Sequence, residues 1–340
     1  MNSPLVAKTM QTLSQSTSEI RSPVASRQHR IANIERLRIL SAFGVASFHT
    51  HDWFPRSLGI VGFIVLLLSF CVFVVNRPEP YGFTDLAKRK AARLLKPWLF
   101  WSLVYGGVGL AKMIYMDVPF SDVFSATMLL TGTRIHLWFL PFGFVAALLL
   151  VLVHQRMAKT PEIFNIVTAA LVGLLCVLGC AILQSRGQLP VPLLQWTLGL
   201  PAIPLGFAIG RATVLPEPKD RRKLYLFIVL ATAAAFVAYT ALIGLQRGTW
   251  FDHGSKFIIR HCISTALVCS ALQWRGRLDL ISGILGSLSY GIYLVHPLVL
   301  VFLYQFGISV QQPLVLLFCV LVASVVITLV LKRTPLRQFV

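Results

Sequence analysis

The sequence has few charged residues, and acidic ones are especially scarce. Only 13% of its 340 residues are charged and 56% are hydrophobic, whereas soluble domains carry about 25% charged residues. The mean hydropathy is +0.75. These values exclude an ordinary soluble domain and indicate an integral membrane protein. The sequence has 31 Lys and Arg residues and only 12 Asp and Glu residues, an excess that could suggest nucleic-acid binding. The chain has no soluble basic domain that could hold a duplex, however, so we expect no nucleic acid partner.

Two further features are missing, and each excludes a class of site or signal. The six cysteines lie in apolar runs without paired C-x-x-C spacing, so we expect neither a disulfide framework nor a metal site. We also expect no bound cofactor. Residues 1–30 contain no apolar run and are rich in Ser, Thr and Gln. They therefore cannot form a signal peptide, and we expect a disordered cytoplasmic tail.

Beyond this tail, apolar segments long enough to cross a bilayer alternate with charged or Pro- and Gly-containing junctions. We predict an all-α, polytopic membrane protein: one domain, residues 31–335, of about ten transmembrane helices, with no fused soluble domain. The predicted spans are residues 34–53, 57–76, 94–116, 135–154, 163–184, 194–210, 224–245, 257–273, 282–306 and 312–331. Pro201 and Pro204 should kink the sixth span.

The distribution of basic residues predicts the orientation of these spans. If the tail lies inside, 24 of the 31 Lys and Arg residues fall on the inner side and only seven on the outer side. This bias follows the positive-inside rule, which favours an even number of spans and places both termini in the cytoplasm.

The first predicted span carries ionisable residues at both of its ends. Glu35 and Arg38 lie near its inner end, and His49 lies near its outer end, followed by His51 and Asp52. Eleven residues separate Arg38 from His49, which in a helix is three turns plus about 20°, so both side chains leave the same stripe, with a rise of about 16 Å between them. Ionisable groups in a membrane are costly unless they face a wet or paired interior, which makes both residues functional candidates.

Each of these residues has a functional and a structural interpretation. An imidazole such as that of His49 can take a proton from a hydroxyl and later return it, but an interfacial histidine bonded to water would look the same. Arg38 can pair with Glu35, three residues earlier on the same face. Alternatively, Arg38 is an anchor that snorkels to the inner boundary.

A basic cluster precedes the third span in the second inner loop. It contains Lys88, Arg89, Lys90 and Arg93, and the two arginines are one helical turn apart. Neighbouring guanidinium and ammonium groups suit a phosphorylated ligand, because Arg can grip phosphate with two donors. Alternatively, this cluster binds no phosphorylated substrate and serves only to set the membrane topology or to bind lipid.

The fourth and ninth spans add further candidates for residues that line a cavity, as His51 and Asp52 also could. His136 and Trp138 open the fourth span, whereas Tyr290, Tyr293 and His296 follow at steps of three on one face of the ninth. A stripe of hydroxyl and imidazole groups in a membrane bundle either lines a cavity or hydrogen-bonds a neighbouring helix. For Trp138, an interface anchor is the alternative.

Four short motifs occur in a fixed order along the chain. They are the Arg-x10-His spacing of Arg38 and His49, the basic stretch that leads into RLLKPWLFWSL (residues 93–103), HLWFLP (136–141) and LGSLSYGIYLVHPLVL (285–300). Each is weak alone, but the four in order make a strong signal. Together they resemble acyltransferase family three, the bacterial integral-membrane O-acyltransferases that modify polysaccharides and other envelope glycans.

This resemblance implies a ten-span bundle in the bacterial cytoplasmic (inner) membrane. It would take an acyl group, usually acetyl, from cytoplasmic acyl-CoA and place it on a sugar hydroxyl of a polysaccharide or lipid-linked sugar, commonly at the outer face. In that family the residues matching Arg38, His49 and the basic loop are required. Glu35 stands where an aspartate is common, and Lys90 stands where Arg is expected, which leaves Arg89 and Arg93 as the firmer donor-binding residues.

Two alternatives to this function remain. A proton-coupled transporter or flippase could use the same intramembrane charges as a relay, although no inverted repeat of broken helices is found. An acyltransferase that acts on a small cytoplasmic molecule would keep the chemistry and change the acceptor, but the outer position of His49 disfavours it.

Overall fold

The computed structural model describes residues 33–50, 56–76, 82–187, 189–244, 251–274, 280–305 and 313–340. Within these ranges the chain is almost entirely helical and forms no β-strand. Nine helices of this part of the chain are long and apolar enough to cross a membrane, and each overlaps one predicted span. The first helix, residues 33–50, coincides with the remaining one. The all-α, multi-span prediction is therefore confirmed, and the expected tail lies outside the described residues.

The elements that follow the first helix have well-defined bounds. They are α2 (Arg56–Asn76), α3 (Phe83–Met116), α4 (Phe120–Val123), α5 (Met128–Thr131), the 3₁₀ helix η1 (Ile135–Trp138), α6 (Phe139–Arg156), α7 (Glu162–Ser185), α8 (Leu193–Gly199), α9 (Ala202–Thr213), α10 (Pro218–Tyr239), the π-helical turn η2 (Thr240–Gly244), α12 (His253–Gln273), α13 (Leu280–Gln305), α14 (Pro313–Lys332) and η3 (Pro335–Phe339).

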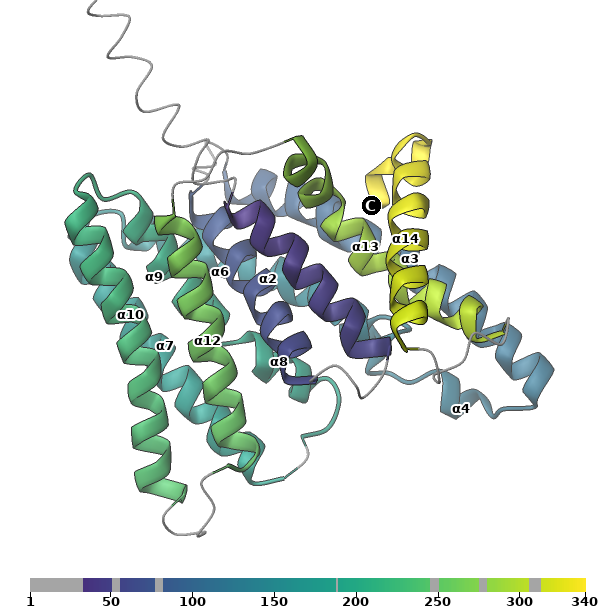
Figure 1. Ribbon diagram of the computed structural model, residues 1–340, viewed down its shortest axis with the longest axis horizontal. Helices are drawn as coiled ribbons and strands as arrows, with labels where there is room; N and C mark the ends of the chain where they lie inside the picture. Colours follow the sequence, from purple (N-terminus) through teal and green to yellow (C-terminus); the bar gives the residue numbers. More distant parts are fainter. Residues whose placement is uncertain are drawn as a thin grey trace, which may run out of the picture.

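The helices pack as two groups that meet at α2 and α6. In Figure 1, α7, α9, α10 and α12 stand on the left, and α3, α13 and α14 stand on the right. One hydrophobic cluster fills the left group and includes residues of α2 and α6. A second cluster joins α3, η1, α6, α13 and α14 to the C-terminal half of the first helix. The first helix therefore lies beside the seam between the two groups.

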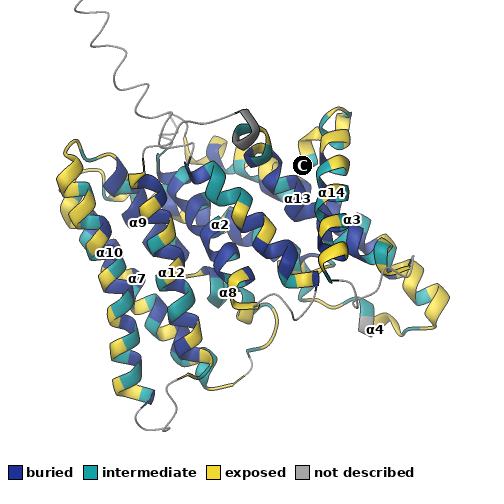
Figure 2. Cartoon of the chain, viewed as in Figure 1, coloured by how far each residue is buried: buried dark blue, intermediate teal, exposed yellow. Residues whose placement is uncertain are grey.

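Apolar side chains also cover the outside of the bundle. Figure 2 shows buried residues on the helix faces that meet inside and exposed residues on the outer faces. Val237 of α10, Leu175 of α7 and Phe318 of α14 are all more than three-fifths exposed. In water such a surface would promote aggregation, whereas in a bilayer it faces lipid, as the apolar composition predicts.

Small residues let the first helix and α2 approach closely. A Cβ atom added to Gly62 of α2 would lie 3.0 Å from the backbone oxygen of Ser41 on the first helix. Contacts of this kind are typical of helix bundles in membranes. The hydrophobic effect does not drive helices together in lipid, so close van der Waals packing has to stabilise their association. The close approach fixes the first helix against α2 along its length.

The sixth predicted span is interrupted where the prolines occur. Helix α8 ends at Gly199, Pro201 caps the start of α9, and Pro204 lies in the first turn of α9. A proline ring has no N–H and collides with the preceding turn, so the backbone cannot continue as one straight helix there. The predicted kink is thus confirmed as a break between two helices.

The third span begins earlier than predicted, which corrects the interpretation of the basic cluster. Helix α3 has 34 residues and starts at Phe83, so it is about 51 Å long, well beyond the roughly 30 Å of a hydrocarbon core. Lys88 to Arg93 therefore lie on the first turns of α3 and not in a loop. The residues between Phe83 and Lys96 include several strong helix formers and no Gly or Pro, so nothing stops the helix at the membrane boundary.

Candidate active site

The N-terminal end of the first helix holds the ion pair that its sequence predicts. The Arg38 guanidinium donates from Nη1 to both carboxylate oxygens of Glu35, at 2.9 and 3.0 Å. The two side chains are only 25% and 16% exposed, respectively. A pair that is largely shielded and doubly hydrogen-bonded holds a defined geometry, unlike a pair on an open surface.

Three other helices surround this ion pair. Glu35 packs against Gly286 of α13, and the Arg38 guanidinium carbon lies 5.9 Å from the centre of the Phe73 ring on α2. Lys332, the last residue of α14, is close enough to Arg38 to interact with it electrostatically. Arg38 is therefore directed toward neighbouring helices rather than outward, which agrees better with the functional interpretation than with a snorkelling anchor.

At the C-terminal end of the first helix, His49 lies beside a second histidine. The ring centres of His49 and His296 on α13 are 5.3 Å apart, with their planes at 38°. His136 of η1 lies beside them, with its ring centre 6.1 Å from that of His296. His296 is completely buried, whereas His49 is exposed. Three imidazoles predicted from three separate spans thus form one cluster, and His49 is its most accessible member.

The hydrogen-bond partners within this cluster define one tautomer. The Nδ1 of His296 lies 3.2 Å from the backbone oxygen of Ile292. Because a carbonyl oxygen can only accept, this nitrogen carries the proton and Nε2 carries the lone pair. The Nε2 atoms of His296 and His136 are both buried and have no hydrogen-bond partner among the residues that the structure describes.

Tyrosines connect the histidine cluster to the surrounding helices. Tyr293 donates its hydroxyl to the backbone oxygen of His136, which ties α13 to η1. Tyr105 of α3 donates to the backbone oxygen of Leu294 at 2.7 Å, and its ring centre lies 4.9 Å from that of His136. Tyr293 therefore anchors a neighbouring element, whereas the buried hydroxyl of Tyr290 has no partner within the described part of the chain.

Sequence reasoning did not identify Tyr105 or Lys332. Tyr105 lies in the middle of an apolar span, and only its position two turns beyond Trp98 on α3 marks the face that turns inward. From the sequence, Lys332 is only one of the basic residues on the predicted inner side of the membrane.

Trp138, a predicted cavity residue, packs its ring against Phe63 and Phe142, with ring centres 5.3 Å away in each case.

The predicted donor-binding residues share one end of α3. Lys88, Arg89 and Arg93 are exposed and Lys90 is half-buried. Arg93 is close enough to the Tyr290 hydroxyl of α13 to interact with it electrostatically. Along α13, Tyr290, Tyr293 and His296 then lead from the basic end of α3 to His49.

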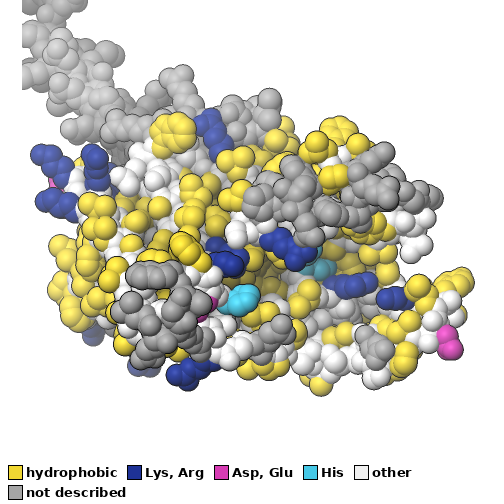
Figure 3. Space-filling model, turned by 60° about the horizontal axis from the view of Figure 1, so that its bottom comes forward, with side chains coloured by type: hydrophobic (Ala, Val, Ile, Leu, Met, Phe, Trp, Pro, Cys, Tyr) yellow, Lys and Arg dark blue, Asp and Glu magenta, His cyan; other side chains and the backbone are white. Residues whose placement is uncertain are grey.

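Some basic side chains also lie at the end of the bundle where the first helix finishes. Figure 3 looks onto the end where the first helix finishes, and it shows Lys and Arg side chains in a broken band beside a hollow, with a histidine side chain inside the band. Arg134, which precedes η1, is close enough to His136 to interact with it. The predicted cavity residues His51 and Asp52 lie outside the described residues.

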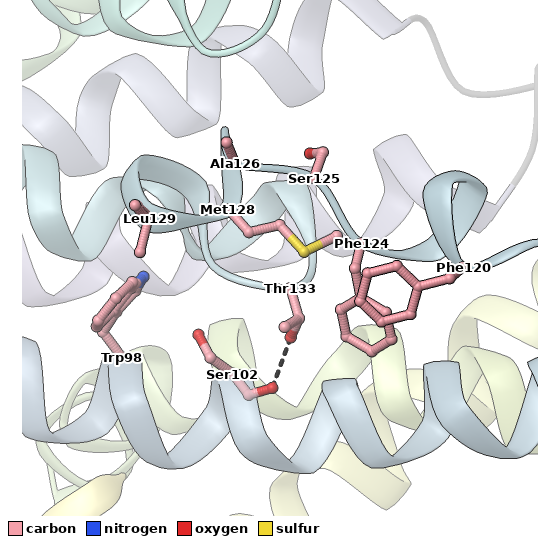
Figure 4. A pocket seen from close by; sticks show the side chains of 9 residues that line it. All are labelled: Trp98, Ser102, Phe120, Phe124, Ser125, Ala126, Met128, Leu129 and Thr133. Carbon is pink, nitrogen blue, oxygen red and sulfur yellow. Dashed lines mark hydrogen bonds between the residues drawn. The ribbon is translucent and has the colours of Figure 1, made fainter.

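A cavity of about 480 Å³ lies on another side of α3. Figure 4 shows Trp98 and Ser102 reaching from α3 toward the segment that contains α4 and α5, where the Thr133 hydroxyl donates to the Ser102 backbone oxygen at 2.6 Å. Its walls are mostly apolar, and none of the residues that line it was a predicted site residue. This cavity does not join Arg38 to His49.

The described part of the chain contains no group of three or more His, Cys, Asp or Glu side chains placed to hold a metal ion. The candidate residues described above supply an imidazole with a neighbouring imidazole, a shielded arginine and a basic helix end. Such groups can move a proton and bind an anionic ligand.

Comparison with known proteins agrees with this combination of helices and side chains. A family model described as an acyltransferase domain, that of acyltransferase family 3, matches residues 31–333. No characterised protein and no solved structure was found to match the chain. Because the family match covers the first helix, the basic end of α3, η1 and α13, the chain belongs to acyltransferase family 3 and is a multi-pass membrane acyltransferase.

Proposed function

We propose that the protein moves an acyl group, most simply acetyl, from cytoplasmic acyl-CoA to a sugar hydroxyl of a polysaccharide or other cell-surface glycan. The observation that carries this proposal is the placement of Arg38 and His49 at opposite ends of one helix, with both side chains directed at α13 or its neighbours. The rise between them is about 16 Å, roughly half of the hydrocarbon thickness. One helix face therefore connects a donor end and an acceptor end.

At the donor end, the CoA phosphates would bind to the exposed basic residues on the first turns of α3. Arg89 and Arg93 occupy one face of that helix, so both guanidinium groups can reach the same phosphate cluster. The Lys and Arg bias along the sequence supports a cytoplasmic position for this end, where acyl-CoA is found. The phosphates would stay outside the bilayer, because burying their charge is very costly.

Between the two ends, the pantetheine arm and its thioester would follow α13. Tyr290 begins this path next to Arg93, and its buried hydroxyl has no partner within the described chain. His296 ends the path next to His49. The arm has no net charge and only a few polar groups, so a protein-lined slot is sufficient and a water-filled pore is not needed.

At the acceptor end, His49 would act as a general base. It takes the proton from the acceptor hydroxyl while the hydroxyl oxygen attacks the thioester carbonyl carbon, and it then gives that proton to the departing CoA sulfur. The products are the O-acylated sugar and free CoA, with His49 returned to its neutral form. A route in which His49 first accepts the acyl group is less favoured, because the exposed imidazole already has direct access to an outer hydroxyl.

Membrane vesicles of known orientation test this function. Inside-out and right-side-out vesicles from bacteria that express the protein are supplied with radiolabelled acetyl-CoA. We expect release of CoA and alkali-labile label in the glycan fraction only when the donor reaches the cytoplasmic side. If the thioester stays intact, the protein is not an acyl-CoA-dependent transferase, and a transporter is favoured. If the label appears only in small soluble molecules, the acceptor is a cytoplasmic molecule and not a glycan.

A further inference from the structure

His296 combines complete burial with an unused hydrogen-bond acceptor. It lies on α13 with no exposed surface, and its Nδ1 donates to the backbone oxygen of Ile292 at 3.2 Å. This bond fixes both the ring orientation and the tautomer, so the lone pair lies on Nε2. Nε2 has no donor among the residues that the structure describes. Buried acceptors are normally hydrogen-bonded, so we expect a donor to bind to this nitrogen.

Of the two imidazole rings beside His296, that of His49 has the nearer ring centre. With ring centres 5.3 Å apart, nitrogens that face each other can come within the roughly 3 Å of an N–H···N hydrogen bond. His49 is exposed, so its ring has room to turn toward His296. His136 is a poorer donor candidate, because its ring centre is further from His296, at 6.1 Å.

We propose that His296 is a positioning residue that selects the reactive tautomer of His49. In this arrangement the Nε2 of His296 accepts a hydrogen bond from one ring nitrogen of His49, which leaves the lone pair of the other His49 nitrogen free to take the proton of the acceptor hydroxyl. The inference rests on the proposed role of His49 as general base. The first helix then contributes the general base, and α13 contributes the residue that positions it.

This pair follows the general design in which a third group orients the base, a role that a carboxylate often fills. None of the carboxylates that the structure describes hydrogen-bonds to either ring, and Glu35 at the other end of the helix is committed to Arg38. An oriented neutral imidazole can accept the same hydrogen bond and so fix the tautomer and orientation of the base, without the charge of a carboxylate. His296 keeps its own Nδ1 proton throughout, so the proton that His49 takes up passes to the leaving sulfur and not along α13.

Three variants at position 296 separate the acceptor role from simple packing. A Gln side chain can place its carbonyl oxygen near the position of Nε2, whereas an Asn side chain reaches only the position of Nδ1, and Leu supplies no acceptor. Purified protein in lipid nanodiscs is assayed for release of CoA from acetyl-CoA in the presence of the labelled glycan fraction, and correct folding is checked by gel filtration and circular dichroism.

We expect His296→Gln to keep kcat within about tenfold of the wild type, and His296→Asn and His296→Leu to lose about 100-fold or more, as loss of general-base function does. The KM for acetyl-CoA should stay unchanged in all three. Wild-type kcat in His296→Leu would overturn the inference, and so would equal losses in the Gln and Asn variants, because packing alone would then explain the effect.

His49→Ala, assayed in parallel, separates this inference from the proposed function. An inactive His49→Ala protein together with an active His296→Leu protein would remove His296 from the mechanism and leave the proposed function standing. Normal turnover in His49→Ala would overturn both.

Discussion

The Glu35 carboxylate packs directly against Gly286, so the ion pair on the first helix is built onto the backbone of α13. A Cβ atom added at Gly286 would lie 2.9 Å from the Cβ of Glu35 and closer still to its carboxylate. Such a contact cannot exist with any side chain at position 286. The absence of a side chain on α13 thus determines where Glu35 holds the Arg38 guanidinium.

Gly286→Ala tests this relationship. The added methyl group should displace the Glu35 carboxylate and with it Arg38, and a displacement of about 1 Å near a reacting group can cost about 100-fold in rate. We expect kcat for acyl transfer to fall by that order while the protein still folds. Gly107→Ala on α3 is the matched control, because a Cβ atom there would meet nothing within 4 Å; an equal loss in both variants would contradict the prediction.

His49→Ala should abolish acyl transfer without unfolding the protein. A general base contributes about 10²- to 10⁴-fold to the rate, and no other described imidazole of the cluster is exposed as His49 is. Turnover of radiolabelled acetyl-CoA measures the loss. His253→Ala is the control, because His253 is also exposed at the outer end of the bundle but lies at the start of α12. Near-normal turnover in His49→Ala would remove this residue from the mechanism.

The double variant Arg89→Ala with Arg93→Ala should weaken binding of the donor. A hydrogen bond to a charged group contributes about 1.5 kcal/mol or more, which corresponds to about tenfold in affinity. We expect the KM for acetyl-CoA to rise by at least that factor and kcat at saturation to change little. Initial rates over a range of donor concentrations give both constants.

The control for the donor-binding prediction is Lys219→Ala with Arg222→Ala. These residues are exposed at the corresponding end of α10, so this variant loses the same number of charges at the same side of the membrane. If the KM rises equally in both double variants, the α3 cluster acts only through net charge or topology.

Asp252 should make the stability of the outer end depend on pH. Burial by itself raises the pKa of this carboxyl, but hydrogen bonds from the Ser255 backbone N–H and the Tyr239 hydroxyl outweigh it and hold the pKa below its ordinary value. A carboxylate with a depressed pKa stabilises the fold above its unfolded pKa of about 3.9, and this contribution is lost as the pH falls through the folded value. Thermal unfolding in detergent between pH 3 and pH 7 should show this loss.

Asp252→Asn should remove the pH dependence and keep the cap of α12, because an amide oxygen can still accept from the Ser255 N–H. Asp117→Asn is the control at an exposed carboxylate, where the backbone is left-handed and Asn is readily accommodated. An Asp252→Asn protein that still loses stability in the same pH window would assign the effect to another group.

Local patterns in the chain were enough to predict the spans and the Glu35–Arg38 pair. The spans follow from bilayer thickness, because about 20 consecutive apolar residues are needed to cross it. The ion pair follows from helical spacing, because residues three apart lie on one face. The start of α3 was predicted wrongly because hydropathy marks where the membrane begins, whereas the helix continues through Lys88 and Arg93, which are good helix formers outside lipid as well.

Long-range neighbours depended on how the helices are arranged around one another. Hydropathy shows that a helix crosses the membrane but not which helix lies beside it, so the contact of His49 with His296 and that of Glu35 with Gly286 could not be read from spacing. The same holds for Tyr105, whose apolar surroundings along α3 hide its contact with His136. Each of these contacts joins segments far apart in the chain, and only the packing of small residues and the closure of the bundle bring them together.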